Sequence, residues 1–425
     1  MKSKHQENAN LNLVPSELVQ VRELVQSHEA WRSRTLNLIA SENVLSPAVR
    51  AALDNDWLGR YSDYTGRDLK ARRYHGTRYI AELEQIVESM AKKTFRADFV
   101  ENRPLSGHLA GAAVISALCK PGDVVLEVGS EGGSHREAKK FSTPSLMQID
   151  VRFLPFDGAR FNIDIPNAIK LIEETKPRLI ILGSSTFLFP HPVQEIKSAL
   201  LQLNPDCILV YDASHVMGFI ASHRFQDPLM EGADVVFGST HKTFPGPQGG
   251  IIFTNREDLM IPISEAVYPA LVTNHHAFRM PAFAIALAEM KVFGQAYMDQ
   301  IVTNSQALGR NLEAQGFPCV QVDGRFSMSH TILMKVRKNE ESEETAERLE
   351  AADIITTACT LPKVHGMKGI RLGVQELTRL GAIEPEISQV ARLIAQAILQ
   401  KQPVDATAEG VHSLTSSLGP IRFTW

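Results

Sequence analysis

The sequence predicts an α/β protein in which helices cover both faces of a mostly parallel sheet and a smaller α+β domain follows at the carboxyl end. Three observations favour this fold class. Short β-branched segments alternate with amphipathic helical patterns between residues 98 and 255, the order that builds a parallel sheet. A long helical pattern over residues 282–315 follows them. At 425 residues the chain is too long for one compact core.

The expected elements can be placed in order along the chain. A first helix is expected over residues 16–34, where apolar side chains recur at helical spacing at Leu18, Val21, Leu24 and Val25. Strands are expected at residues 123–129, 151–156, 178–184, 207–214, 233–239 and 250–255, with helices at 165–177 and 192–204. The domain limits that follow are an amino-terminal segment 1–45, a large domain 46–300 and a small domain 301–425.

Composition excludes several classes of protein. The formal net charge is −4 and there is no long basic run, so the charge pattern of a nucleic-acid binder is missing. No apolar run reaches membrane-spanning length, and the first thirteen residues lack the apolar core of a signal peptide. The cysteines form no CxxC pair, which argues against a zinc site or a disulfide framework: Cys119, Cys207, Cys319 and Cys359. We therefore expect a cytoplasmic protein without a metal, a membrane or a nucleic acid as partner.

The most specific local signal surrounds Lys242. Residues 238–250 read GSTHKTFPGPQGG and follow an expected core strand. Hydroxyl groups flank the lysine, and the glycines allow main-chain N–H groups to approach an anion closely. A lysine removed from water has a lowered pKa and attacks a carbonyl carbon to give a Schiff base. The alternative is a solvated surface lysine at the end of a strand.

Two further segments place polar groups where the expected sheet meets its loops. Asp212 ends an apolar strand, where open α/β sheets bind their ligands, and its carboxylate suits a protonated pyridine nitrogen. The alternative is that Asp212 caps the following turn. Ser106 and Gly107 open an apolar helix, whose free N–H groups attract phosphate. Simple N-capping by Ser106 is the alternative there.

An arginine in the expected small domain gives the fourth signal. Arg371 lies in the short apolar segment GIRLG at residues 369–373. Burying a guanidinium is costly unless the group meets an anion. A bidentate contact with a substrate carboxylate would provide that anion, and an internal salt bridge is the alternative.

The four signals occur along the chain in the order found in the fold-type I (aspartate aminotransferase-like) pyridoxal-phosphate enzymes. The helix that would bind phosphate comes first, at Ser106 and Gly107, and is followed by Asp212, Lys242 and Arg371. Within that group the chain resembles the serine hydroxymethyltransferase family over nearly its whole length. The motifs that carry the resemblance are LNLIASEN (36–43), DASH (212–215), STHKT (239–243) and GIRLG (369–373). The resemblance implies a fold-type I architecture, pyridoxal phosphate as cofactor, a small amino acid as substrate, and a homodimer with its sites at the subunit interface.

The resemblance also implies roles for individual residues. Lys242 would form the Schiff base with the cofactor, and Asp212 would pair with its pyridine nitrogen. The further cofactor-binding residues that it implies are Ser106, Gly107, His108, His135, Ser185, His215, Thr240 and His241, with Thr273 and Asn274 in the segment that reaches the partner's phosphate. The substrate-binding residues that it implies are Ser41, Tyr61, Tyr74 and Arg371.

One loop departs from the family's pattern. The family's folate and proton-transfer loop typically reads YAEG…KRYYGG, whereas residues 61–76 read YSDYTGRDLKARRYHG. Asp63 stands at the position of the glutamate and His75 at that of the second tyrosine, and the loop is a few residues longer. We expect Asp63 and His75 to be catalytic, because both lie in a polar, Gly-containing loop between two helical segments, where function concentrates and core packing is thin. A histidine can also exchange protons near neutral pH. These changes call into question the use of tetrahydrofolate or another pterin.

The function implied is aldol and retro-aldol chemistry on a β-hydroxy amino acid, such as the interconversion of serine and glycine. The second hypothesis is a specialised biosynthetic relative that does not use tetrahydrofolate. Such an enzyme would be a threonine-type transaldolase, or a β-eliminating or decarboxylating enzyme acting on an amino-acid conjugate. A third hypothesis is a non-catalytic partner subunit, against which the retained Lys242, Asp212 and Arg371 argue.

Overall fold

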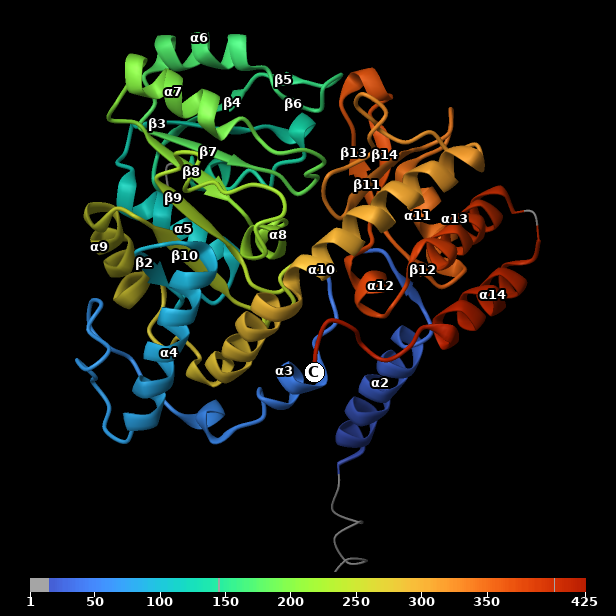
Figure 1. The fold of residues 1–425 in the computed structure, drawn as a ribbon, viewed down its shortest axis with the longest axis horizontal. Coiled ribbons are helices and arrows are strands. Elements are labelled where there is room, and N and C mark those ends of the chain that lie inside the picture. Colours follow the sequence, from blue (N-terminus) through green and yellow to red (C-terminus); the bar gives the residue numbers. More distant parts are fainter. Residues whose placement is uncertain (1–14, 144–145, 401) are drawn as a thin grey trace, which may run out of the picture.

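A seven-stranded sheet forms the centre of the large domain in the computed structural model, which describes residues 15–143, 146–400 and 402–425 (Figure 1). Its strand order is β2-β10-β9-β8-β7-β3-β4, and β10 pairs antiparallel with both neighbours while the other pairings are parallel. The strands are β2 (Phe99–Glu101), β3 (Val124–Val128), β4 (Asp150–Leu154), β7 (Leu179–Gly183), β8 (Ile208–Asp212), β9 (Val235–Ser239) and β10 (Gly250–Thr254). The mostly parallel sheet expected from the sequence is thereby confirmed.

The central strands are buried on both faces because successive side chains enter two different cores. In β7, Ile180 and Leu182 belong to the core on one face, whereas Leu179 and Ile181 belong to the core on the other. Helices line the two faces: α4 (Arg78–Phe95), α5 (Gly107–Leu118), α6 (Ile165–Thr175), α7 (Val193–Leu203), α8 (Met217–Ala221) and α9 (Glu257–Glu265). The expected strands were right in position and one to two residues too long at most ends.

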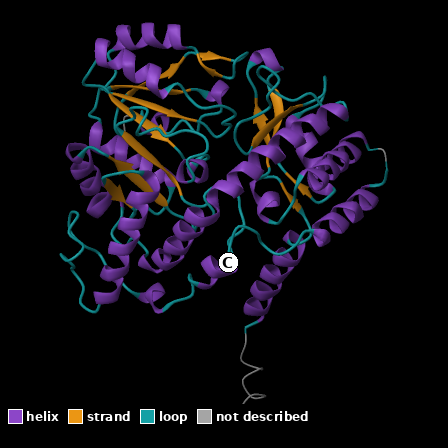
Figure 2. Ribbon diagram, viewed as in Figure 1, coloured by secondary structure: helices purple, strands orange, loops and turns teal. Residues whose placement is uncertain are grey.

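The long helix α10 (Met280–Ala314) connects the large domain to a smaller one, close to the helix expected at 282–315. It runs diagonally across the view, from the lower part of the large domain toward the small domain (Figure 2). The small domain has an antiparallel sheet in the order β11-β14-β13, and its elements are β11 (Thr331–Lys335), α11 (Ser342–Ala351), β13 (Thr357–Thr360), β14 (Lys368–Gly373), α12 (Gln375–Arg379), α13 (Glu384–Leu399) and α14 (Val404–Ser417).

Several short elements complete the chain, and most gave no recognisable sequence pattern. Strand β1 (Leu36–Asn37) pairs in parallel with β12 (Ile354–Ile355), so the amino-terminal segment joins the small domain. The others are α3 (Pro47–Ala51), the hairpin β5 (Phe156–Asp157) and β6 (Asn162–Ile163), the 3-10 turns η2 (Asp56–Gly59), η3 (Ser130–Gly132), η4 (Ala138–Phe141), η6 (Ala277–Arg279) and η7 (Lys363–His365), and the π-helical segment η5 (Ala266–Leu271).

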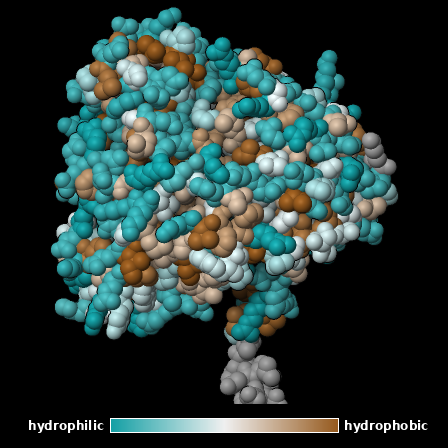
Figure 3. All heavy atoms as spheres, viewed as in Figure 1, coloured by the Kyte–Doolittle hydropathy of each residue, from teal (hydrophilic) through white to brown (hydrophobic). Residues whose placement is uncertain are grey.

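The first helix that the structure describes, α2 (Ser16–Arg32), projects from the rest of the molecule (Figure 1). It lies where the sequence places it, but its apolar residues are not buried, and Leu24 is 70% exposed. Apolar spheres are visible on this helix in Figure 3. None of the described helices is both long enough and apolar enough to cross a bilayer. The first thirteen residues, read above as lacking a signal peptide, lie outside the described part of the chain.

Candidate active site

Lys242 lies in the loop between β9 and β10, in the partly buried position expected from the sequence. Side chains fix this loop from three directions. Thr240 Oγ1 donates to the Pro247 carbonyl at 2.7 Å, Thr243 Oγ1 to the His215 carbonyl at 2.9 Å, and Asn43 Nδ2 to the Lys242 carbonyl at 2.7 Å. The main chain of the lysine is therefore rigidly placed.

The electrostatic surroundings of Lys242 favour the neutral amine. Burial lowers its pKa to about 8, with the positive charge of Arg371 acting in the same direction and the nearby Asp212 carboxylate opposing it. About a tenth of the side chain is then uncharged at pH 7, compared with well under a thousandth for an ordinary lysine. A neutral amine can attack a carbonyl carbon, so the solvated-lysine alternative does not describe this site.

Asp212 ends β8, and its neighbours in the sheet are Gly183 of β7 and Phe237 of β9. Its Oδ1 accepts a hydrogen bond of 2.9 Å from the Ser214 main-chain nitrogen, so the turn-capping contact is present. The second carboxylate oxygen has no partner in the described part of the chain and remains available to another group. A Cβ on Gly183 would lie 2.6 Å from the Asp212 Cβ, which explains why glycine stands beside this aspartate.

The amino end of α5 reaches the same edge of the sheet. Ser106 is the N-cap and accepts from the Leu109 main-chain nitrogen at 3.1 Å, so the capping alternative also holds. A Cβ on Gly107 would lie only 2.4 Å from Ser239 Oγ and 3.1 Å from Ser214 Oγ. The start of α5 therefore packs on Ser239, the last residue of β9 before the Lys242 loop, and on Ser214, which follows Asp212. The first main-chain N–H groups of a helix have no partner within the helix, so this terminus is suited to an anion.

A carboxylate that the sequence reasoning missed lies beside these residues. Glu137 is buried, and its oxygens contact His108 Nδ1, Lys140 Nζ at 3.3 Å and His135 Nε2 at 3.7 Å. Burial raises its pKa despite Lys140 and His108. His108, His135 and Glu137 lie close enough together to share a cation, although the Lys140 ammonium already offsets the carboxylate charge. The charged and polar residues around it, which read GGSHREAKK over 132–140, gave no signal for a buried carboxylate in the sequence.

Arg371 lies in the middle strand of the small-domain sheet, between Leu333 of β11 and Thr357 of β13. Its Nη1 donates to the Ser185 carbonyl at 3.0 Å, and its buried Nε has no partner among the described residues. No acidic side chain of the described chain forms an ion pair with it, so the internal salt bridge considered above is not found. Burial lowers the pKa of this guanidinium, as expected for a cation that lacks its anion.

Three histidines adjoin Lys242. His215 is buried and stacks on His330 with ring centroids 5.8 Å apart. Burial, assisted by Lys242 and Arg371, lowers its pKa well below 6.5. Burial also lowers the pKa of His241, to about 4, and the Nδ1 atom of this histidine has no hydrogen-bond partner in the described chain. His241 and Ser41 line a cavity of about 940 Å³ between the amino-terminal segment and the Lys242 loop.

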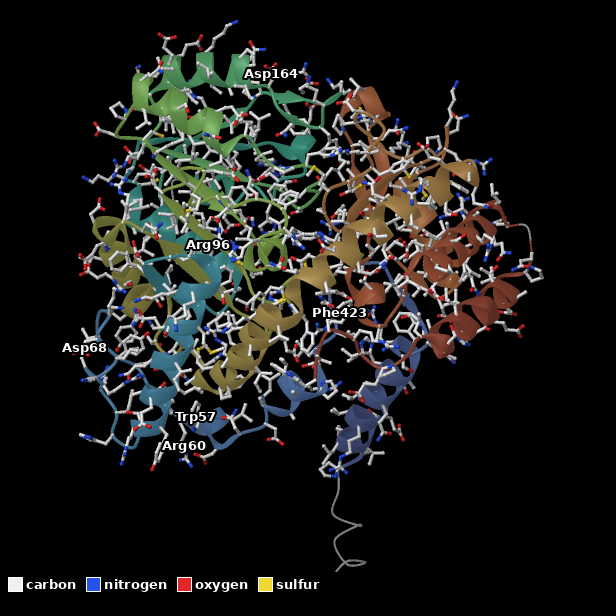
Figure 4. The ribbon with its side chains drawn as sticks, in the orientation of Figure 1. Trp57, Arg60, Asp68, Arg96, Asp164 and Phe423 are labelled. Carbon is white, nitrogen blue, oxygen red and sulfur yellow. The ribbon has the colours of Figure 1, made fainter. Side chains whose placement is uncertain are left out.

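The remaining expected residues do not contact this cluster within one chain. Tyr61 and Tyr74 pack against each other with ring centroids 5.3 Å apart, and with His75 they line a separate cavity of about 280 Å³. Figure 4 shows this part of the chain, marked by Trp57, Arg60 and Asp68, at the outer edge of the large domain beside α4. Thr273 is exposed and Asn274 is half-buried in the loop before η6.

Asp63 requires a correction. We expected it in a loop with little core packing, but Asp63 is only 4% exposed and its carboxylate lies near the buried His275. The expectation was wrong because the loop folds back on itself, with Tyr64 and Arg72 forming an antiparallel bridge. The polar sequence of the loop did not reveal this internal pairing.

Comparison with known proteins places this arrangement in a family. Residues 14–394 match the family described as Serine hydroxymethyltransferase. The serine hydroxymethyltransferase of Methanopyrus kandleri is 41% identical over 94% of this chain and 93% of its own length. That of Saccharolobus islandicus is 38% identical over 97% of this chain and 95% of its own.

A solved structure gives the same result for the fold. The L-threonine transaldolase of Pseudomonas fluorescens, in its internal aldimine state, superposes with a TM-score of 0.90 and 29% identity, covering 100% of this chain and 96% of that one. The architecture is that of the fold-type I pyridoxal-phosphate enzymes. The chain belongs to the serine hydroxymethyltransferase family of pyridoxal-phosphate-dependent enzymes.

Proposed function

We propose that the protein makes and breaks the Cα–Cβ bond of a β-hydroxy amino acid, as in the interconversion of serine and glycine. The observation that carries this proposal is that the Arg371 guanidinium forms no ion pair with the described residues, although it lies close enough to Lys242 to lower the pKa of that lysine. A substrate carboxylate would supply the missing anion through two parallel hydrogen bonds. The α-amino group and Cα would then be directed toward Lys242.

The residues at the sheet edge fit pyridoxal phosphate. The amino end of α5 at Ser106 and Gly107 offers N–H groups for the phosphate, and Asp212 has a free carboxylate oxygen for the pyridine nitrogen. Lys242 would hold the aldehyde carbon, and the remaining contacts would come from His108, His135, Ser185, His215, Thr240 and His241, with Thr273 and Asn274 from a second subunit. When bound, the cofactor withdraws electrons from the substrate Cα.

The chain's own groups then have separate tasks. Arg371, assisted by Ser41, holds the carboxylate and fixes which bond of Cα faces the ring. Lys242 has a pKa of about 8, so it can accept and return a proton near neutral pH. The buried His215 remains neutral because burial lowers its pKa, and it can therefore donate a hydrogen bond without adding positive charge.

A second candidate is a transaldolase that transfers the group at Cβ to another aldehyde without tetrahydrofolate. Two observations favour it. Asp63 and His75 stand where the family's folate loop has a glutamate and a tyrosine, and the L-threonine transaldolase of Pseudomonas fluorescens has a closely similar fold. Tyr61, Tyr74 and His75 would contact the β-substituent from the partner subunit. We also propose that the protein is a cytoplasmic homodimer.

One experiment separates these candidates. Purified protein loaded with pyridoxal phosphate is incubated with serine, threonine or allo-threonine, each with and without tetrahydrofolate, and the products are identified. Glycine formed from serine only when tetrahydrofolate is present supports the first candidate. Aldehyde released from threonine, and new β-hydroxy amino acid formed on adding an acceptor aldehyde, supports the second. Lys242→Ala is the control, and no product in any mixture would contradict both.

A further inference from the structure

A buried network of charged side chains joins the 61–76 loop to the segment that precedes η6. His275 is at its centre and is only 1% exposed. Its Nε2 lies 2.5 Å from Glu84 Oε1 on α4 and 3.3 Å from Ser62 Oγ. Its Nδ1 lies 3.6 Å from Asp63 Oδ1. One imidazole therefore faces a carboxylate on each side.

The contact between Asp63 and His275 is specific. Neither Asp63 Oδ1 nor His275 Nδ1 has a hydrogen-bond partner elsewhere in the described chain, and the two atoms lie 3.6 Å apart. Two buried carboxylates are costly unless a cation compensates them. Burial lowers the pKa of His275, but the adjacent carboxylates of Asp63 and Glu84 outweigh burial and raise its pKa overall. The site therefore favours the imidazolium more than water does.

Arg72 extends the network into the loop. Its guanidinium pairs with Glu84, donates to the Ser62 carbonyl at 2.5 Å and to the Leu69 carbonyl at 2.6 Å, and lies over the Tyr64 ring at 4.7 Å. The Tyr64 ring in turn packs edge-on against His275, at 5.7 Å between centroids. The base of the loop is therefore tied to α4 and to His275 by its own residues.

Arg279 extends the network in the opposite direction. Its Nε donates to the His275 carbonyl at 3.4 Å, and its Nη2 donates to the Pro104 carbonyl at 3.1 Å, two residues before Ser106. A Cβ on Gly249 would lie 2.4 Å from Arg279 Nη1, so the guanidinium also packs against the end of the Lys242 loop. The contacts run without a gap from the 61–76 loop to the start of α5.

We propose that His275 is a positioning residue that, held between Asp63 and Glu84, fixes the 61–76 loop in the geometry needed for reaction at Cβ. The inference rests on the proposed function and changes the role expected for Asp63. Asp63 acts through His275, while Tyr61, Tyr74 and His75 remain the loop side chains available to a substrate. Loss of the network frees the loop without disturbing Arg371, which lies on the small-domain sheet.

The test uses full-length holoenzyme with Asp63→Asn, His275→Gln and the double variant. The control is His223→Asn, because His223 lies outside the network and has a positive φ of 57° that asparagine tolerates. Trypsin reports on the loop, in which Lys70 and Arg73 are exposed. The dissociation constant of the amino acid and kcat are measured for the same proteins.

Each single variant should raise tryptic cleavage within residues 67–73 by about tenfold or more, because opening exposes the backbone. Amino-acid affinity should stay within about threefold of the parent, and kcat should fall by roughly 10- to 100-fold, as for misplaced groups. The double variant should lose no more kcat than the worse single variant. Because it removes both charges, it also guards against misfolding caused by an unpaired Asp63 carboxylate.

Two results would overturn the proposal. Cleavage at the parent's rate in both single variants would show that the network does not hold the loop. Losses in kcat that multiply in the double variant would show that Asp63 acts on the substrate independently of His275. If the parent turns over no β-hydroxy amino acid, the proposed function fails, and the tryptic cleavage rates still decide whether His275 positions the loop.

Discussion

Asn43 Nδ2 donates a hydrogen bond of 2.7 Å to the main-chain carbonyl of Lys242. The same amide nitrogen lies 3.0 Å from the hydroxyl oxygen of Tyr297 on α10, and that hydroxyl donates to the Gln375 carbonyl at 2.8 Å. Residues distant in sequence thus connect the main chain of Lys242 to the helix between the domains and to the first residue of α12, the helix that follows the strand of Arg371.

Lys242 should be the point of covalent attachment. The protein loaded with pyridoxal phosphate should be yellow, and borohydride reduction followed by peptide mapping should mark Lys242. Lys242→Ala should lose the covalent label but retain part of the cofactor, because the phosphate and ring contacts remain. Lys140→Ala is a matched control that removes a nearby lysine, and it should leave the label in place. Label on any other lysine would exclude the assignment.

The pKa of Lys242 gives a pH dependence for cofactor capture. A lysine with a pKa of about 8 gains its neutral form as the pH rises, so the rate at which the apoprotein links to pyridoxal phosphate should rise roughly fivefold from pH 7 to pH 8. Above about pH 9 the rate should level off. Stopped-flow absorbance measures the rate both in the rising range and on the plateau. A rate that still rises tenfold per pH unit up to pH 10 would indicate an ordinary lysine.

Arg371→Lys should weaken substrate binding while leaving cofactor content nearly unchanged. A lysine donates from one point and cannot reproduce the two parallel hydrogen bonds of a guanidinium. The loss should be about 1.5–3 kcal/mol, or roughly 10- to 150-fold in the dissociation constant of the amino acid. Spectral titration with glycine measures it, and Arg224→Lys, in a surface pair with Asp299, is the control. Unchanged affinity would remove Arg371 from the site.

Gly107→Ala should destabilise the protein and impair cofactor binding together. The added methyl group would lie 2.4 Å from Ser239 Oγ and 2.9 Å from the Ser239 main-chain nitrogen, and main chain cannot move aside cheaply. Overpacking of this kind costs about 1–3 kcal/mol, visible as a lower Tm. Gly59→Ala meets no atom within 4 Å and should leave Tm nearly unchanged. Equal Tm values for the two variants would contradict the close packing of α5 on β9.

The sequence was most informative where local pattern and chemistry coincide. The strands before Asp212 and Lys242 are continuous apolar runs, which predict strands buried on both faces, and both residues lie at the expected ends. Glu137 and His275 gave no such signal, because each acquires its partners only through tertiary contacts with residues from other elements. The pairing of β1 with β12 was missed for the same reason, since two-residue strands leave no periodicity.

We predict that the role of His75 depends on its chemistry rather than on packing. It is exposed and lines the cavity of about 280 Å³ with Tyr61 and Tyr74, so it lacks the buried partners that hold Asp63. An exposed imidazole can exchange a proton near neutral pH, which a phenol at the same position does poorly. His75→Phe should therefore leave folding, tryptic cleavage of the loop and amino-acid affinity unchanged, and lower turnover by roughly 10²–10⁴-fold.

His75→Tyr restores the family's side chain and tests whether proton exchange or shape matters. A tyrosine that supports parental turnover only with tetrahydrofolate would identify His75 as the residue that separates the two candidate reactions. Turnover within a few-fold of the parent for both variants would show that His75 is a bystander, and the choice of reaction would then depend on Tyr61 and Tyr74.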